Sequence, residues 1–163
     1  MSIVVLPGSF DPFTLGHLDL ARRAAALVDE VVIAISHNPA KQGAVPAEQR
    51  RAAIDETLAA DGLDASVRTA MLPTGLLVDF CREIGAEAVV RGIRSQIDLA
   101  YEEPMVRMNR HLAGIDTILL LTDPAYAHIS SSLVREVHAL GGDVADMLPP
   151  ASLRALTQAC AVS

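Results

Sequence analysis

The chain has 163 residues, a formal net charge of −7 and only two cysteines, and 51% of its residues are hydrophobic. A chain of this length buries one sizeable core, so we expect a single domain over residues 1–163. The acidic balance argues against a general nucleic-acid or anionic-membrane binder, because neutralising phosphates needs a basic surface. Cys81 and Cys160 lie far apart, and no apolar run approaches the roughly 20 residues of a membrane span. We therefore expect a soluble, cytoplasmic protein.

The chain opens with a strand, a turn and a helix. Residues 3–6, Ile-Val-Val-Leu, are typical of a short buried strand, and residues 18–25 predict an amphipathic helix. Between this strand and this helix, at the expected helix start, lie Ser9, Thr14 and His17. A helix N-terminus presents unpaired backbone N–H groups and the positive end of the dipole, which suit an anion. The opening stretch therefore predicts a phosphate-binding turn.

Four more strands and several helices follow. The strands are expected over residues 30–36, 66–72, 86–90 and 116–121. Helices are expected over residues 46–60, 76–84 and 132–140, with a last one after Pro149 and Pro150. Residues 96–111 predict a short helix or irregular piece and then a new helix from about Pro104, since proline disturbs a helix interior. This alternation predicts an α/β fold, a five-stranded parallel, doubly wound (Rossmann-like) sheet with helices on both faces.

Polar groups follow every predicted strand. In doubly wound sheets ligands bind beyond the carboxyl ends of the strands, so these loops should converge. The cations and donors expected there are His17, Lys41, Arg91, Arg94 and Arg135, and the hydroxyls are those of Ser9, Thr14 and Ser130 to Ser132. No acid–base pair, Ser-His-Asp order or metal cluster is evident in the sequence. The set predicts a polyphosphate site and phosphoryl or nucleotidyl transfer by positioning and charge stabilisation.

Two motifs resemble those of a known superfamily. Residues 8–17, Gly-Ser-Phe-Asp-Pro-Phe-Thr-Leu-Gly-His, resemble the nucleotidyltransferase signature with its Thr/His-x-Gly-His core, and residues 129–136, Ile-Ser-Ser-Ser-Leu-Val-Arg-Glu, resemble the second motif. Four further stretches and the total length narrow the resemblance to one family of this superfamily. The stretches are residues 39–41, 91–94, 108–111 and 141–144. Over essentially the whole chain the sequence is similar to the bacterial phosphopantetheine adenylyltransferases.

The resemblance implies an activity and its participants. Adenylate would pass from ATP to 4′-phosphopantetheine by in-line attack on the α-phosphate, giving dephospho-coenzyme A and pyrophosphate in coenzyme A biosynthesis. It also implies Mg²⁺ with ATP, for which we expect no dedicated protein site, and a homohexamer.

The resemblance assigns residues as well. It implies catalytic roles for His17, which would stabilise charge at the α-phosphate, and for Lys41. Lys41 and Arg91 would hold the acceptor phosphate, with Ser9 and Leu77 on the same side, and Arg135 would assist phosphate binding. The residues implied around ATP are Ser9, Phe10, His17, Gly92, Ile93, Arg94, Glu102, Tyr126, Ala127, His128, Ile129, Ser130, Ser131 and Ser132.

Three alternatives stay open at this stage. Ser130 to Ser132 could form a plain helix cap, and that use can coexist with phosphate binding. The enzyme could be another superfamily member, such as a nicotinate-mononucleotide adenylyltransferase or a cytidylyltransferase. Residues 91–94 and 108–111 favour the hypothesis that phosphopantetheine is the acceptor. A non-catalytic ATP-binding module is the alternative from a different class.

Overall fold

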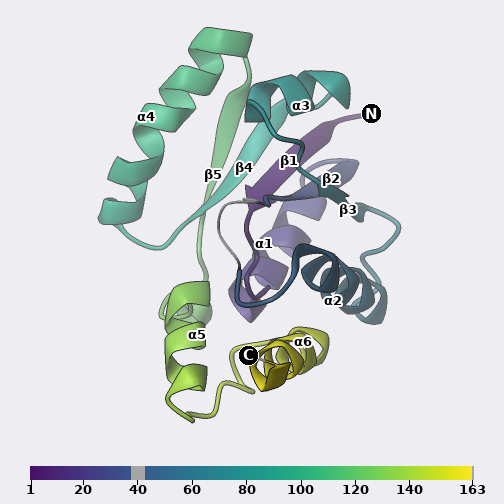
Figure 1. Ribbon diagram of the computed structural model, residues 1–163. Coiled ribbons are helices and arrows are strands. Elements are labelled where there is room, and N and C mark those ends of the chain that lie inside the picture. Colours follow the sequence, from purple (N-terminus) through teal and green to yellow (C-terminus); the bar gives the residue numbers. More distant parts are fainter. Residues whose placement is uncertain (38–42, 163) are drawn as a thin grey trace.

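The computed structural model describes residues 1–37 and 43–162. Within them a single sheet has the strand order β3-β2-β1-β4-β5 (Figure 1), and every pair of neighbouring strands is parallel. The strands are β1 (Ile3–Gly8), β2 (Glu30–Ile35), β3 (Val67–Met71), β4 (Ala88–Ile93) and β5 (Asp116–Leu121). The helices are α1 (Leu15–Ala25), α2 (Ala47–Ala60), α3 (Leu77–Glu83), α4 (Gln96–Ala113), α5 (Ser131–Ala139) and α6 (Pro150–Val162), and the short 3-10 helix η1 spans Pro124–Tyr126. The predicted five-stranded α/β fold is confirmed.

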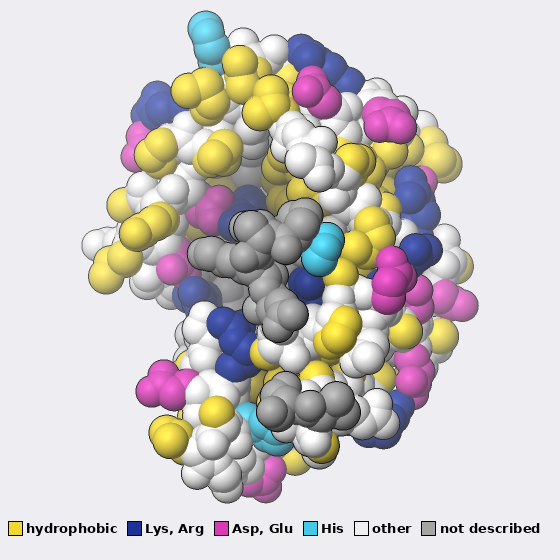
Figure 2. Space-filling model, viewed as in Figure 1, with side chains coloured by type: hydrophobic (Ala, Val, Ile, Leu, Met, Phe, Trp, Pro, Cys, Tyr) yellow, Lys and Arg dark blue, Asp and Glu magenta, His cyan; other side chains and the backbone are white. Residues whose placement is uncertain are grey.

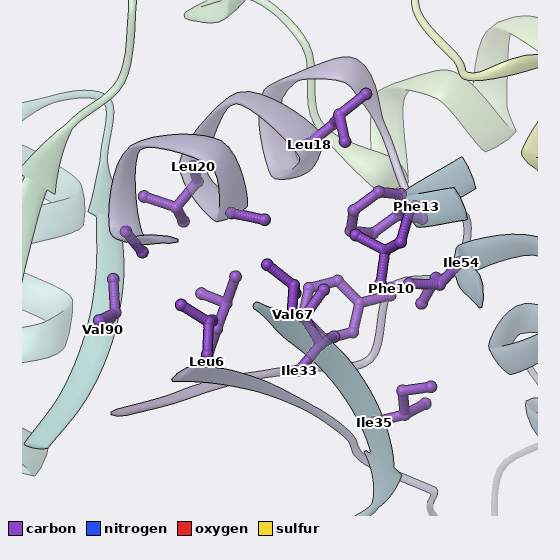
Figure 3. Packing of buried hydrophobic residues seen from close by; sticks show 14 of the residues in the cluster. Leu6, Phe10, Phe13, Leu18, Leu20, Ile33, Ile35, Ile54, Val67 and Val90 are labelled. Carbon is purple, nitrogen blue, oxygen red and sulfur yellow. The ribbon is translucent and has the colours of Figure 1, made fainter. Parts of the chain in front are cut away.

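Helices bury both faces of the sheet. α1 and α2 pack on one face, where Leu18, Leu20 and Ile54 meet Leu6 and Ile33 (Figure 3). α3 covers the opposite face, in a second cluster of buried side chains that includes Val5, Val32, Val78, Phe80 and Val89. Successive strand side chains point to opposite faces, so a strand buried on both sides must be apolar throughout. This explains the unbroken apolar runs of β1 and β2.

The strand order reverses at β1. β2 and β3 extend the sheet on one side of β1, and β4 and β5 extend it on the other. The chain therefore crosses over β1 between β3 and β4, which creates a crevice at the carboxyl ends of β1 and β4. α5 and α6 lie beyond those ends (Figure 1), packed around a third cluster of buried side chains: Val45, Ile129, Val134, Val144, Leu148 and Leu156.

α1 begins at Leu15, not at Leu18 as the sequence pattern predicted. The reason is a capping box at Thr14, whose hydroxyl accepts the His17 N–H at 3.3 Å while its own N–H donates to His17 Nδ1 at 3.0 Å. Apolar periodicity begins only at Leu18, whereas polar contacts fix the first turn of the helix. His17 therefore lies in the first turn of α1, at the edge of the crevice.

α4 is one continuous helix with Pro104 inside it, so the predicted break is wrong. The helix is fixed at both ends: the Ser95 hydroxyl accepts the Asp98 N–H at 3.2 Å, and Gly114 stops the helix with φ of 70°. Pro104 and Ala100, whose carbonyl loses its helical donor, are both exposed, so water can replace the lost bond. Among the described residues no helix is long and apolar enough to cross a membrane.

Candidate active site

A cavity of about 440 Å³ opens where the strand order reverses. Its walls come from the end of β1, the start of α1, the end of β4, α4 and the segment that leads into α5. The predicted site residues that line it are Ser9, Phe10, His17, Arg91, Gly92, Arg94, Glu102, Tyr126, Ile129, Ser130, Ser131 and Ser132. Arginine side chains lie around a hollow on the face shown in Figure 2.

Other predicted residues lie elsewhere. Ile93 is buried in β4, and Ala127 and His128 are exposed outside the residues that line this cavity. Leu77 lines a second, neighbouring cavity. Lys41 lies outside the described residues, so its predicted role stays a prediction.

His17 is held in one orientation by its neighbours. Its Nδ1 accepts the Thr14 N–H, so in the neutral ring the proton sits on Nε2. Burial, together with the charges of Arg94 and Arg91, lowers the pKa of His17 to about 4. At neutral pH this half-buried side chain is therefore an uncharged hydrogen-bond donor and not a cation.

Two aromatic rings fix the plane of the imidazole. Phe10 meets it edge-on with centroids 5.1 Å apart, and Phe13 stacks on it at 5.6 Å. Phe10 can lie there because it adopts φ of 49° and because Gly8 has no side chain: a Cβ on Gly8 would come within 2.9 Å of the Phe10 ring. The apolar rings also supply the burial that keeps His17 neutral.

Two arginines from the end of β4 reach the cavity, each beside a carboxylate of α4. Arg91 donates from Nε to Glu102 at 2.8 Å in a bidentate pair, and from Nη1 to the Pro7 carbonyl at 2.8 Å. Arg94 pairs with Asp98 at 3.0 Å, and this contact holds the pKa of Asp98 below its usual value against the opposing effect of burial. The pairs fix both guanidinium groups at the cavity wall.

A second cavity of about 470 Å³ adjoins the first. Its lining is mainly apolar and includes Leu76, Leu77, Val78, Met105, Val106, Met108 and Leu112. Arg91 and Glu102 line both cavities, as do Pro7 and Gly8. A ligand that extended from one cavity to the other would therefore pass Arg91.

The start of α5 closes the first cavity. Ser130 caps the helix by accepting the Leu133 N–H at 3.2 Å, and the Ser131 hydroxyl donates to the Pro12 carbonyl at 2.8 Å. Arg135 is not among the cavity-lining residues, because its Nη1 donates to the Asp11 carbonyl. The helix-capping role is therefore confirmed for Ser130. Arg135 instead contacts the loop after β1, at the carbonyl of Asp11.

Comparison with known proteins assigns the family. Residues 5–137 match the family described as cytidylyltransferase-like. A phosphopantetheine adenylyltransferase from Clavibacter michiganensis subsp. michiganensis is 54% identical over 154 residues, which cover 94% of each chain. Another, from Leifsonia xyli subsp. xyli, is 52% identical over 91% of this chain and 93% of its own. The chain belongs to the phosphopantetheine adenylyltransferase family.

Solved structures at lower identity support the fold of this adenylyltransferase. A protein from Vibrio parahaemolyticus described as a nicotinate-nucleotide adenylyltransferase superposes with a TM-score of 0.68 at 18% identity, covering 96% of this chain and 99% of that one. A lipopolysaccharide core biosynthesis protein from Thermoplasma volcanium gives a TM-score of 0.55 at 22% identity, over 76% and 97% of the two chains. At these identities the likeness concerns the fold alone.

Sequence reasoning missed several residues of the adenylyltransferase site. Asp98, Asp11 and Arg50 were not singled out, yet each holds a residue or loop of the cavity. A signal for Arg50 was present: it shares the buried face of α2 with Ala53 and Ile54, at helical spacing. A charged residue on an apolar face needs partners, and that need points to a role.

Proposed function

We propose that the protein transfers adenylate from ATP to 4′-phosphopantetheine, giving dephospho-coenzyme A and pyrophosphate, in coenzyme A biosynthesis. The observation that best supports this reaction is the position of Arg91, in the wall between a polar cavity and an apolar one. Relatives named phosphopantetheine adenylyltransferase, at 45–54% identity over nearly the full chain, support the same reaction.

ATP would occupy the first cavity. The N-termini of α1 and α5 border it, and their free N–H groups and dipoles favour the phosphates. Arg94 adds a fixed positive charge beside them. His17 would direct its Nε2–H to the α-phosphate, where negative charge grows as the attacking oxygen approaches.

The acceptor would occupy the second cavity. Its apolar walls suit the extended, largely uncharged pantetheine arm, and its phosphate would reach Arg91. Glu102 already takes two donors of that guanidinium, so an incoming phosphate must share or displace the carboxylate. Leu77 lies in this wall, in agreement with the substrate-side role that the resemblance implies.

The reaction needs no covalent enzyme intermediate. An oxygen of the acceptor phosphate attacks the α-phosphorus of ATP, the bond to the β-phosphate oxygen breaks, and pyrophosphate leaves. Both reactants are anions, so fixed cations must offset their repulsion before the atoms can approach. Arg91 and Arg94 supply that charge, and we retain Lys41 as a further contributor on the acceptor side.

A divalent ion, Mg²⁺, would enter bound to the ATP phosphates. Among the described residues no group of three His, Cys, Asp or Glu side chains could hold a metal. Both carboxylates that line the first cavity, Asp98 and Glu102, are paired with arginines. The ion's contribution would be to neutralise phosphate charge, and the residues above would orient the reactants around it.

We also propose a homohexamer and a cytoplasmic location. Support for assembly comes from exposed apolar residues on α4 and β5, which are more numerous than a monomer normally presents in one region. They are Ile97, Leu99, Tyr101, Leu119 and Leu121, together with Met105, Met108 and Leu112, which also line the second cavity.

A two-substrate assay tests the reaction. The protein should release pyrophosphate from ATP and Mg²⁺ only when 4′-phosphopantetheine is added, and mass spectrometry should detect dephospho-coenzyme A. Nicotinate mononucleotide, supplied in a parallel reaction, should give no product. Release with that acceptor alone would identify a different adenylyltransferase, and ATP binding without release for either acceptor would identify a non-catalytic module.

A further inference from the structure

Arg50 is a buried arginine near the start of α2 whose side chain joins three backbone segments. Its Nε donates to the Val45 carbonyl at 2.9 Å, and its Nη1 donates to the Ser36 carbonyl at 3.3 Å and to the Ser9 carbonyl. Ser9 follows β1, Ser36 follows β2, and Val45 leads into α2. One guanidinium therefore fastens the ends of two adjacent strands to the helix beyond them.

The carbonyls that Arg50 holds belong to two different cavities. Ser9 lines the first cavity, and Ser36 lines the second. The Ser36 N–H also donates to the Gly8 carbonyl at 2.8 Å, so the two strand ends are tied directly as well. Arg50 itself lines neither of these cavities and acts on them only through the backbone.

Asp11 makes a second tie in the same place. Its two carboxylate oxygens accept the N–H groups of Ala44 and Val45, both at 2.8 Å. The chain approaches so closely that a Cβ on Gly43 would lie 2.8 Å from Asp11 Oδ2. The loop after β1 and the segment before α2 are thus locked together from both sides.

Burying the charge of Arg50 is costly, and its backbone contacts offset that cost. Burial lowers the pKa of the guanidinium, and the nearby charge of Asp11 opposes that effect. An apolar side chain of similar length would avoid the desolvation cost. It would, however, leave the carbonyls of Ser9, Ser36 and Val45 without this donor, and the two strand ends would be joined only by backbone bonds such as that of Ser36 to Gly8.

We propose that Arg50 is a positioning residue, which sets the distance between the Ser9 wall of the nucleotide cavity and the Ser36 wall of the acceptor cavity. The inference rests on the proposed function, because it assigns one reactant to each cavity. Through these walls Arg50 holds the attacking phosphate oxygen in line with the α-phosphorus. Small displacements at this point affect the rate more than the affinity for either reactant.

The test compares Arg50→Met and Arg50→Lys with a matched control, Arg51→Met. Arg51 is the next residue of α2, is exposed, and pairs with Asp55 at 3.8 Å. Calorimetry counts binding sites and measures the affinity for ATP and for 4′-phosphopantetheine separately, and pyrophosphate release gives turnover per site. We expect Arg50→Met to lose roughly a hundredfold in kcat per site with each Kd within about threefold, Arg50→Lys to recover part of the loss, and Arg51→Met to match the parent.

A merely structural role gives a different result, because it lowers the number of binding sites and leaves turnover per site unchanged. That result, or a loss of affinity that matches the loss of turnover, overturns the inference. If Arg50→Met fails to fold, Arg50→Lys decides, and its full turnover per site would overturn the inference. A parent protein that releases no pyrophosphate refutes the proposed function itself, whereas an active parent with unaffected Arg50 variants refutes only the role of Arg50.

Discussion

His17 shows how a single residue can serve the local fold and the site together. Its Nδ1 completes the capping box with Thr14, and that bond leaves the Nε2 proton available to a ligand. Phe10 and Phe13 keep the ring in place and out of water. A positive charge on His17 would face Arg91 and Arg94, so the neutral form is the one the site favours.

Replacing His17 by Ala tests the donor role. Alanine has no side-chain donor and favours the helix, and the backbone N–H at this position can still donate to the Thr14 hydroxyl. We expect kcat to fall by roughly a hundredfold or more, with the ATP dissociation constant changed only a few-fold, because the donor acts mainly in the transition state. Steady-state kinetics and equilibrium ATP binding measure the two effects. Turnover within a few-fold of the parent would contradict this assignment.

The same variant should also change the pH dependence of stability. The pKa of His17 is about 4 in the folded protein against 6.5 for the free side chain, so between these values the unfolded chain binds the additional proton. The parent should therefore lose stability as pH falls from 6.5 toward 4, at up to about 1.4 kcal/mol per pH unit from this residue. Urea unfolding at several pH values measures the slope. The slope should be less steep for His17→Ala, and the control His111→Ala, at an exposed position of α4, should match the parent.

At the scale of elements, α4 determines how the two cavities meet. Its Glu102 pairs with Arg91 of β4 and its Asp98 with Arg94, which follows β4, while Met105 and Leu112 line the apolar cavity. These residues come from both sides of Pro104, so a helix broken there would separate the polar contacts from the apolar wall. Continuity of α4 is therefore required by the site as well as by the fold.

Pro104→Ala should stabilise the protein. Alanine restores the N–H that the interior of α4 lacks and removes the steric conflict of the ring, while the more flexible unfolded chain offsets part of the gain. We expect a net increase of about 1 kcal/mol in the free energy of unfolding, measured by urea denaturation, without loss of turnover. Pro150→Ala is the matched control, since Pro150 is the first residue of α6, where proline costs little. A stability gain in the control and none at Pro104 would refute this account of α4.

At the scale of the whole molecule, apolar residues on α4 and β5 remain exposed. Figure 2 shows yellow side chains gathered on the part of the surface that α4 occupies in Figure 1. β5 is the last strand on its side of the sheet, and its Leu119 and Leu121 are exposed. An exposed edge strand beside an apolar surface is typical of a region that associates with another chain.

Light scattering should give a mass near six times the 17.2 kDa of the chain. Leu119→Glu should lower that mass, because a carboxylate on this surface would be buried without a partner in an assembly. Leu27→Glu is the control, since Leu27 is also exposed but lies just after α1, outside α4 and β5. A parent that is monomeric at micromolar concentration would contradict the hexamer.

The amino-acid sequence was enough to predict the class of fold and most of the residues that line the first cavity. Apolar runs marked the strands, and the two motifs lie where α1 and α5 begin, at Leu15 and Ser131. These signals depend on residues close together in the chain. The predicted break at Pro104 was wrong because it rested on the proline alone. The caps at Ser95 and Gly114, at the two ends of the helix, were not considered.

Contacts between segments far apart in the chain could not be predicted from the sequence. Arg91 meets Glu102, Arg50 meets the carbonyls of Ser9 and Ser36, and Arg135 meets the carbonyl of Asp11. Such pairings depend on strand order and on the desolvation cost that each buried charge must offset. No local pattern encodes these two quantities, because both arise only when the sheet is assembled and its helices exclude water.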